Sequence, residues 1–266
     1  MSDAVVTIRG ATKVFDVGAD QTRALDGIDL EIGKGAFVSL IGPSGCGKST
    51  LLRLIGDLTQ PTAGQVQVNG KSAHQARIDR DYGIVFQSPV LFDWRTVEEN
   101  VELPLEVGGV DRRKRAERAR AMLVLVELTG FEKRYPWQLS GGMQQRVAIA
   151  RALSFEPAIL LMDEPFGALD EMTRERLNLE LLGIWRQTGT TIVFVTHSIP
   201  EAVFLSTKVV VMSARPGRIV DVIDVDLPQP RNDLTREDPR YFSFVTRVRE
   251  SLRGRVEGAS LRAAGS

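Results

Sequence analysis

Directly after the apolar residues 36–41, the chain reads Gly42-Pro43-Ser44-Gly45-Cys46-Gly47-Lys48-Ser49-Thr50. These residues fit the phosphate-binding pattern GxxxxGK[ST], in which glycines let backbone N–H groups close around phosphate oxygens. A Gly/Ser-rich stretch can also be a plain strand-to-helix turn. The apolar strand pattern before it and the helical pattern after it favour the phosphate site, so we expect residues 42–50 to hold a nucleotide.

Three side chains in this stretch have distinct expected roles. Lys48 would reach the β and γ phosphates, and Ser49 would offer its hydroxyl to Mg²⁺. A helix beginning near Lys48 would direct its positive N-terminal end at the same anion. Cys46 is the one cysteine of the chain. Because it lies beside a lysine and near a helix N-terminus, we expect an acidic thiol whose alkylation inhibits the protein and is prevented by ATP.

The composition is that of a globular protein. The chain has 266 residues, of which 43% are hydrophobic and 26% charged, enough for one sizeable core with or without a subdomain. Lys+Arg 34 against Asp+Glu 34 gives no global basic field, so we expect no nucleic-acid partner. A single cysteine excludes a disulfide framework and a cysteine-based zinc site, and fits a reducing compartment. No leader pattern and no apolar run near the ~20 residues of a membrane span is visible, so we expect a soluble chain.

Several apolar runs end in polar side chains. The runs are residues 82–86, 158–162 and 190–196, and the polar residues that follow them are Gln87, Asp163 with Glu164, and His197. In open α/β folds, ligands bind at the carboxyl edge of the sheet, where such side chains would lie. Asp163 is placed to hold the water shell of Mg²⁺ and Glu164 to polarise an attacking water. A lone Gln is usually only a polar strand end, and Gln87 by itself has little weight.

The N-terminal part predicts antiparallel strands. Residues 5–15 and 25–32 alternate apolar and polar side chains, as strands with one solvated face do. Phe15 lies near the loop end of the first strand, where an aromatic ring can stack on a purine. From the residues alone, a core position for Phe15 is the favoured interpretation.

The middle of the chain is predicted to be helical. Thr96 and Glu99 form a possible capping box, and residues 112–128 have an apolar helical face. The basic residues 112–115 are flanked by Asp111 and Glu117, so a solvated helix face is favoured over a nucleic-acid site. Ser140 would cap a further helix, and the glycines that follow it make a second anion cradle.

The end of the chain is predicted to form closing strands over residues 208–212 and 217–225, followed by a polar segment. A final amphipathic helix then has an apolar side that we expect to serve for packing. The residues assigned to that side are Phe242, Val245, Leu252 and Val256.

Taken in order, these motifs resemble the ATP-binding cassette ATPases over nearly the whole chain. They comprise the phosphate loop, Gln87, LSGGM at 139–143, the apolar-DE run at 159–164, ALD at 168–170 and His197. The resemblance implies an α/β P-loop NTPase core with an antiparallel β subdomain and an inserted α-helical subdomain. We expect a core with the phosphate loop over 1–87, a helical subdomain over 88–157, the remaining core over 158–227, and a helical tail over 228–266.

The resemblance also implies roles, with ATP and Mg²⁺ as ligands. Phe15 is similar to the aromatic that stacks on adenine, and Gln87 to the residue that senses Mg²⁺ and the γ phosphate. Glu164 resembles the catalytic base, and His197 the γ-phosphate switch. In the family, two cassettes enclose two nucleotides head to tail, and the segment Ser140 to Gln144, which we call the signature, closes over ATP on a second subunit. The residues implied for that contact are Ser140, Gly141, Gly142, Gln144 and the coupling residue Asp170.

A finer resemblance, in residues 91–97, 163–170 and 215–219, is to ATPase subunits of nitrate, sulfonate and taurine importers. In those systems the surface from Ser88 to Glu106 grips a cytoplasmic helix of the membrane permease, which makes Phe92 and Trp94 candidate contacts. This implies a homodimer bound peripherally at the cytoplasmic face of the membrane and, indirectly, a solute-binding protein. The alternative is a soluble ATPase of iron–sulfur assembly, DNA repair or translation. The hypothesis of a GTPase is less favoured than either of these, because the sequence contains no guanine-recognition motif.

Overall fold

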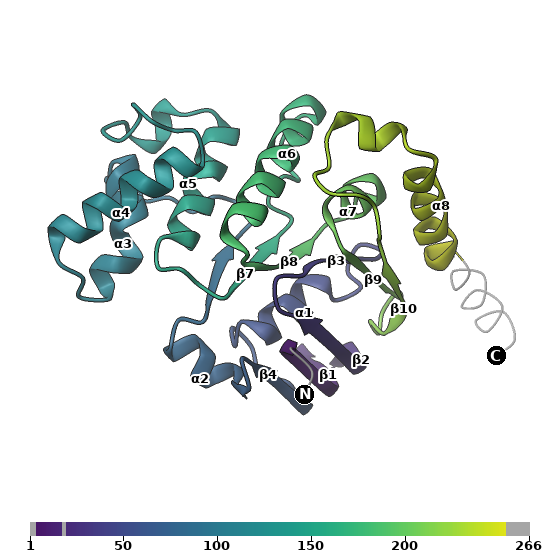
Figure 1. Cartoon of the computed structure of the whole chain (residues 1–266). Helices are drawn as coiled ribbons and strands as arrows, with labels where there is room; N and C mark the ends of the chain where they lie inside the picture. The colour runs from purple at the N-terminus through teal and green to yellow at the C-terminus, as the bar shows by residue number, and fades with distance from the viewer. Residues whose placement is uncertain (1–3, 18–19, 254–266) are drawn as a thin grey trace, which may run out of the picture. The chain divides into compact units, whose positions relative to one another are not determined.

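The structure, a computed structural model, describes residues 4–17 and 20–253 (Figure 1). It divides into two compact units. Unit 1 comprises Met1–Asp81 and Thr191–Ser266, and unit 2 comprises Tyr82–Thr190. The helical segment expected in the middle of the chain therefore falls in unit 2, while the described segments before and after it in the sequence belong to unit 1.

Parallel strands form the centre of unit 1. Strand β3 (Phe37–Ile41) pairs in parallel with β8 (Thr191–Val195) and β9 (Lys208–Met212), and β10 (Ile219–Asp224) is antiparallel to β9. Every residue of β3 and β8 is buried, as expected for strands covered on both faces. Helix α1 (Lys48–Ile55) follows β3 after the glycine-rich stretch. The predicted order of strand, loop and helix is confirmed.

An antiparallel sheet completes the strands of unit 1. It contains β1 (Ala4–Val17), β2 (Asp20–Gly33), β4 (Ala63–Val68) and β5 (Lys71–Ser72), in the order β2-β1-β4-β5. The antiparallel pairing of β1 with β2 was predicted and is confirmed. Helix α2 (Ala73–Ile78), which the sequence analysis did not predict, follows β5 and is capped by Ser72.

The last elements of unit 1 are helical. They are α7 (Ile199–Leu205), the 3₁₀ helix η2 (Asp233–Glu237) and α8 (Pro239–Arg253). Helix α8 packs against α7, β9 and β10. The packing role expected for this helix therefore agrees with its contacts.

The residues that make this packing face differ from the prediction. Phe242 is 56% exposed, whereas Tyr241, Val245 and Val248 are buried. Tyr241, Val245 and Val248 have the i, i+4, i+7 spacing of one helix face, and Phe242 lies one residue off it. The assignment of Phe242 to the packing face was wrong, and Val256 lies outside the described residues.

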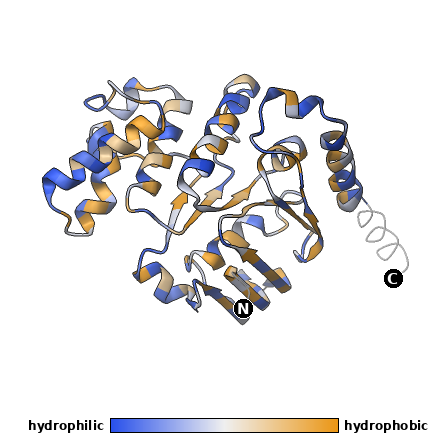
Figure 2. Ribbon diagram, in the orientation of Figure 1, coloured by the Kyte–Doolittle hydropathy of each residue, from blue (hydrophilic) through white to orange (hydrophobic). Residues whose placement is uncertain are grey.

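Unit 2 contains one pair of parallel strands and, among the described residues, four α-helices and a 3₁₀ helix. Strand β6 (Tyr82–Val85) pairs in parallel with β7 (Ile159–Asp163). Figure 2 shows the strands as largely apolar. The helices are α3 (Val97–Val107), α4 (Arg112–Leu125), the 3₁₀ helix η1 (Pro136–Gln138), α5 (Gly141–Leu153) and α6 (Glu171–Thr188). Helices α3, α4 and α5 pack on one another.

Local sequence explains where these helices begin. Thr96 and Glu99 form the predicted capping box of α3, and Asp111 caps α4. The basic start of α4 forms ion pairs, since Arg113 pairs with Glu117 and Arg115 with a glutamate of α3. The exposed Arg113–Glu117 pair agrees with the solvated-face interpretation, whereas both side chains of the Arg115 pair are largely buried between the two helices.

Candidate functional site

The glycine-rich stretch forms a tight loop around the ammonium group of Lys48. Lys48 is only 5% exposed, and its Nζ donates hydrogen bonds to Gly42 O at 2.9 Å and Pro43 O at 3.1 Å. Carbonyl groups of the loop thus hold the cation in place, whereas Ser44 and Gly45 are exposed at the tip. The loop has the form expected of a phosphate site with a fixed positive charge.

Gly47 is required where the loop enters α1. Its φ is +99°, and a Cβ there would lie 2.7 Å from Leu25 Cδ2 and 2.9 Å from Ala24 O. Any other residue would meet both the dihedral penalty and the clash with β2. Ser49 and Thr50 follow in the first turn of α1 and are half-buried. Strand β2 therefore fixes the point where the helix N-terminus faces the loop.

The prediction of an acidic Cys46 thiol was wrong, while the predicted effects of alkylation and of ATP remain predictions. Its side chain is buried, and burial raises the pKa of the Cys46 thiol, with the charge of Lys48 opposing this only in part. The proximity of a lysine and a helix N-terminus suggested the opposite direction, but removal from solvent outweighs both. The thiol is a packing group of the loop, and it does not have the acidic, accessible character that reactive cysteines need.

Phe15 is not a core residue. It is 38% exposed, and the ammonium of Lys13 lies 4.9 Å from its ring centroid. Lys13 pairs across the sheet with Leu25, the residue that contacts Gly47, and Phe15 pairs with Thr22. Phe15 thus lies on the strand beside the phosphate loop with part of its ring accessible, as base stacking requires.

His197 emerges at the same sheet edge as the phosphate loop. Leu40 of β3 is in register with Val195 of β8, so both strands end together before their loops. The turn after β8 is fixed by Thr196, whose Oγ1 donates to Glu201 Oε2 at 2.5 Å and accepts from Ser198 N at 2.9 Å. His197 itself is exposed. Within unit 1, the structure therefore brings the loop and His197 to one edge.

Unit 2 contains Gln87 and the two predicted catalytic-site carboxylates, Asp163 and Glu164. Val85 of β6 is in register with Met162 of β7, so Gln87 and Asp163 lie at one edge. A Cβ on Gly167 would be 3.5 Å from Gln87 Nε2 and 3.7 Å from Glu164 Cβ, which places these two side chains around one turn. Glu164 has a φ of 47°, a left-handed conformation that is rare for a non-glycine residue. Such strain is typical of functional positions.

The LSGGM segment forms the start of α5. Ser140 is the N-cap, and its Oγ accepts a hydrogen bond from Met143 N at 3.3 Å, as predicted. Gln144 Nε2 donates to Pro136 O at 3.0 Å and to Leu139 O at 3.3 Å, which fixes the turn before the helix. Ser140 and Gly141 are exposed. The segment is thus a rigid, accessible helix N-terminus.

Asp170 lies next to that segment. It is the N-cap of α6, and its Oδ1 accepts from Thr173 N at 3.0 Å. This hydrogen bond lowers the pKa of Asp170, so the carboxylate is ionised at neutral pH. A Cβ on Gly142 would lie 3.1 Å from Thr173 Cγ2, so the signature glycine and the start of α6 are in close contact.

Comparison with known proteins agrees with this arrangement. The family described as ABC transporter matches residues 25–167. An uncharacterised ABC transporter ATP-binding protein of Methanocaldococcus jannaschii is 49% identical over 91% of this chain and 90% of its own length. An aliphatic sulfonates import ATP-binding protein of Bacillus cereus is 46% identical over 85% of this chain and 88% of its own.

The solved structures include a bacterial ABC transporter cassette determined as a dimer, and a post-hydrolysis state of a cassette bound to ADP and Pi. Each has a TM-score of 0.73 and 38% identity, and covers 83% of this chain and 98% of the solved one. The chain belongs to the ABC transporter family. It is an ATPase with the cassette fold, and it binds ATP.

The cassette has candidate Mg²⁺ ligands of suitable chemistry. Ser49, Gln87 and Asp163 supply a hydroxyl, an amide and a carboxylate, which are the hard oxygen donors that Mg²⁺ accepts together with substrate phosphates. Ser49 belongs to unit 1, and the other two belong to unit 2. Each of the three side chains thus has the donor chemistry of a Mg²⁺ ligand.

Part of the segment predicted to contact a membrane partner is exposed in unit 2. Trp94 is 73% exposed and Val90 is 57% exposed, and the Trp94 ring lies 4.8 Å from that of Phe92. We call the surface formed by Phe92, Trp94 and the neighbouring Val90 the aromatic surface. Large apolar side chains presented in this way are typical of protein interfaces.

Sequence analysis missed the residues that hold this surface. Asn100 is fully buried, accepts from Phe92 N at 2.8 Å, and donates to Phe92 O and Arg95 O, both at 3.1 Å. Arg151 of α5 donates to Val90 O at 2.7 Å and to Pro89 O at 2.8 Å. The signal for Asn100 was a polar residue on the apolar face of α3, beside Val101.

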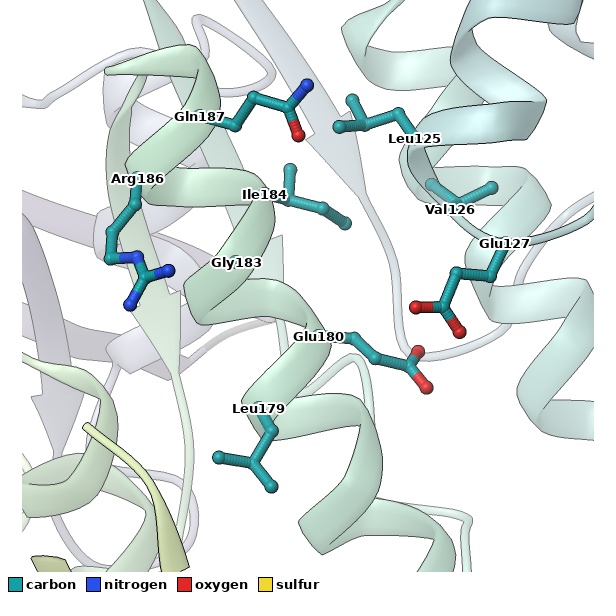
Figure 3. A pocket seen from close by; sticks show the side chains of 9 residues that line it. All are labelled: Leu125, Val126, Glu127, Leu179, Glu180, Gly183, Ile184, Arg186 and Gln187. Atoms are coloured by element: carbon teal, nitrogen blue, oxygen red, sulfur yellow. The ribbon is translucent and has the colours of Figure 1, made fainter. Parts of the chain in front are cut away.

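Unit 2 also contains a pocket of about 620 Å³ between the C-terminal part of α4 and α6 (Figure 3). Its walls include Ile184 and the carboxylates of Glu127 and Glu180. Burial raises the pKa of Glu180, and Arg146, with which it is paired, opposes that effect. None of the residues predicted for nucleotide binding lines this pocket.

Proposed function

We propose that this chain is the ATPase subunit of an importer for a small solute of the nitrate, sulfonate or taurine type and that it works as a head-to-tail homodimer. The observation that carries the importer assignment is the aromatic surface and its attachment to α5, the helix that begins in the signature. Arg151 and Gln145 of α5 donate to backbone carbonyls of Val90 and Phe86, which flank Gln87. A helix that closes on nucleotide is thereby bonded to the segment that would contact a membrane partner.

The expected partner is an integral membrane permease that contacts residues 88–106 with a cytoplasmic helix. No helix among the described residues is long and apolar enough to cross a membrane. We infer peripheral attachment at the cytoplasmic face through that permease, with a solute-binding protein acting on its other side. The sulfonate importer name of the Bacillus relatives supports a solute of the nitrate, sulfonate or taurine type.

For the ATPase site we propose which residues contact the nucleotide, which hold Mg²⁺ and which close the site from a second copy. Residues 42–50, Phe15 and His197 contact the bound nucleotide, with Lys48 at the phosphates. Ser49, Gln87 and Asp163 hold Mg²⁺, which supplies charge neutralisation at the phosphate oxygens. The residues proposed to close the site on a second copy are Ser140, Gly141, Gly142, Gln144 and Asp170.

Glu164 is the proposed general base. Its carboxylate accepts a proton from water as the water oxygen bonds to the γ phosphorus and the bond to the bridging oxygen of ADP breaks. His197 donates a hydrogen bond to the γ phosphate and holds it in place. Lys48 stabilises the charge that develops on the phosphate oxygens.

Co-purification tests the importer assignment. The chain, tagged and produced in its own cells, is recovered in mild detergent alongside Trp94→Ala and Phe242→Ala. Phe242 is the control because it is also an exposed aromatic, 56% accessible, but lies on α8. We expect an integral membrane protein to be retained by wild type and Phe242→Ala and to be lost with Trp94→Ala, while ATPase activity without the partner is unchanged. Recovery with soluble proteins instead would favour a non-transport ATPase and overturn the proposal.

A further inference from the structure

The turn between β9 and β10 packs against the outside of the phosphate loop. A Cβ on Gly217 would lie only 2.0 Å from Cys46 O. Gly217 N donates to Ala24 O at 2.9 Å, and Gly217 O accepts from Asp26 N at 3.0 Å, so the turn is joined to β2 (Figure 1). Gly217 therefore holds one carbonyl of the loop at backbone contact distance, with no room for any side chain.

The same turn reaches the exposed tip of the loop. Arg215 Nη2 lies 3.5 Å from Gly45 O, at the long limit of a hydrogen bond. The N–H groups of the phosphate loop must face an anion when one binds, and a loop carbonyl that does not accept from Lys48, such as Gly45 O, can take a partner outside the loop. The guanidinium of Arg215 offers such a partner and adds a positive charge beside the phosphate site.

The turn is itself rigidly held. Ser213 Oγ accepts from Arg218 N at 3.0 Å and donates to Pro216 O at 3.1 Å. Arg218 forms an ion pair with Asp26 of β2 through both Nε and Nη2. At the other end of the loop, a Cβ on Gly42 would be 2.8 Å from Met212 O of β9. Strand β9, the turn and β2 thus support the phosphate loop at successive points along its length.

We propose that this turn, residues 213–218, is a positioning element of the phosphate loop and that Arg215 and Gly217 set its affinity for nucleotide. The inference rests on the proposal that residues 42–50 hold the phosphates. Gly217 lets the turn approach the Cys46 carbonyl at backbone distance, and the Arg215 guanidinium lies beside the Gly45 carbonyl at the tip. The loop N–H groups are then oriented before nucleotide arrives, which lowers the entropy cost of binding.

The first test uses Arg215→Ala and Arg215→Lys in the full chain, with Arg240→Ala as the control. Arg240 is an exposed arginine of α8 whose partner is Asp238, away from the loop. Nucleotide Kd is measured with a fluorescent ATP analogue, and KM and kcat are measured with ATP. We expect Arg215→Ala to raise Kd and KM about fivefold with kcat nearly unchanged, as loss of one charge-assisted contact predicts, and Arg215→Lys to restore part of the affinity. A Kd equal to that of wild type would refute the role of Arg215.

The second test uses Gly217→Ala with Gly33→Ala as the control, since a Cβ on Gly33 has nothing within 4 Å. We expect Gly217→Ala to raise the nucleotide Kd by about tenfold or more, because the Cys46 carbonyl must move, and Gly33→Ala to leave it unchanged. If Gly217→Ala does not fold, the Arg215 variants decide the matter.

Lys48→Ala separates failure of this inference from failure of the proposed site. Loss of binding in Lys48→Ala with normal binding in both turn variants would overturn the inference and leave the site intact. Normal binding in Lys48→Ala would instead refute the assignment of the phosphate loop.

Discussion

Helices α1 and α5 both begin beside glycines, but their first turns are completed in different ways. At α1 the N-cap is Gly47, and none of the described side chains accepts a cap hydrogen bond there. At α5, Ser140 Oγ accepts from the N–H of Met143. The start of α1 thus has no side-chain cap among the described residues, whereas α5 is capped by the side chain of its own N-cap residue.

This difference indicates unequal roles for the two glycine segments. The phosphate loop adds the buried ammonium of Lys48 to the uncapped N-terminus, which makes it the stronger anion site. The signature offers the hydroxyl of Ser140 and a helix N-terminus, but it contains no lysine or arginine that could correspond to Lys48. We therefore expect the loop to bind nucleotide in a single subunit and the signature to contribute only when two copies meet.

The largest expected effect is that of Glu164→Gln. The amide cannot accept the proton from water, so ATP turnover falls about a thousandfold, while nucleotide binding at the phosphate loop is retained. A dimer holding ATP should accumulate, seen by size-exclusion chromatography with light scattering and by steady-state ATPase assay. Hydrolysis near the wild-type rate would remove Glu164 from the role of base. In the trapped dimer, the contribution of the signature to dimer affinity can be measured separately from the contribution of the loop to ATP affinity.

An intermediate effect is expected for Ser140→Ala in the Glu164→Gln background, compared with Asp111→Ala. Both changes remove an N-cap and should cost about 1 kcal/mol in unfolding free energy, measured by urea denaturation. Only Ser140 is proposed to contact nucleotide on a second copy, so only Ser140→Ala should weaken the ATP-dependent dimer, by about tenfold. Single-subunit ATP affinity should be unchanged in both. Equal dimer affinity for the two variants would break the distinction between loop and signature.

Local chemistry explains what was predictable from sequence. The phosphate loop, the strands β3, β7 and β8, and the caps at Thr96 and Ser140 each depend on residues close in the chain, so their patterns could be interpreted directly. The identities of the catalytic candidates came from the resemblance to a family, and their roles remain predictions.

The parts that sequence did not supply depend on contacts between distant segments. Gly217 is 171 positions from Cys46 in the numbering of the chain, and nothing in its own neighbours indicates that it packs on that carbonyl. The raised pKa of the Cys46 thiol follows from burial by tertiary structure, which outweighed the local cues. The buried face of α8 was also mispredicted from the sequence, because that face is determined by packing against α7, β9 and β10.

The smallest expected effect concerns Asp170, the N-cap of α6, the helix that lies beside the signature. Hydrogen bonding to Thr173 N holds the pKa of this carboxyl below its ordinary value of 3.8. A depressed pKa in the folded state stabilises the protein above the unfolded value, and the contribution is lost as the pH falls through the folded pKa. Asp170→Asn keeps a capping oxygen but removes the charge, so its deficit in unfolding free energy relative to wild type should be small and constant from pH 7 to about pH 5. The deficit should then shrink as the pH falls through 3.8, measured by urea denaturation at each pH. A gap that does not change with pH would show that the charge of Asp170 does not contribute to the capping of α6, and that the caps of α5 and α6 act through hydrogen-bond geometry alone.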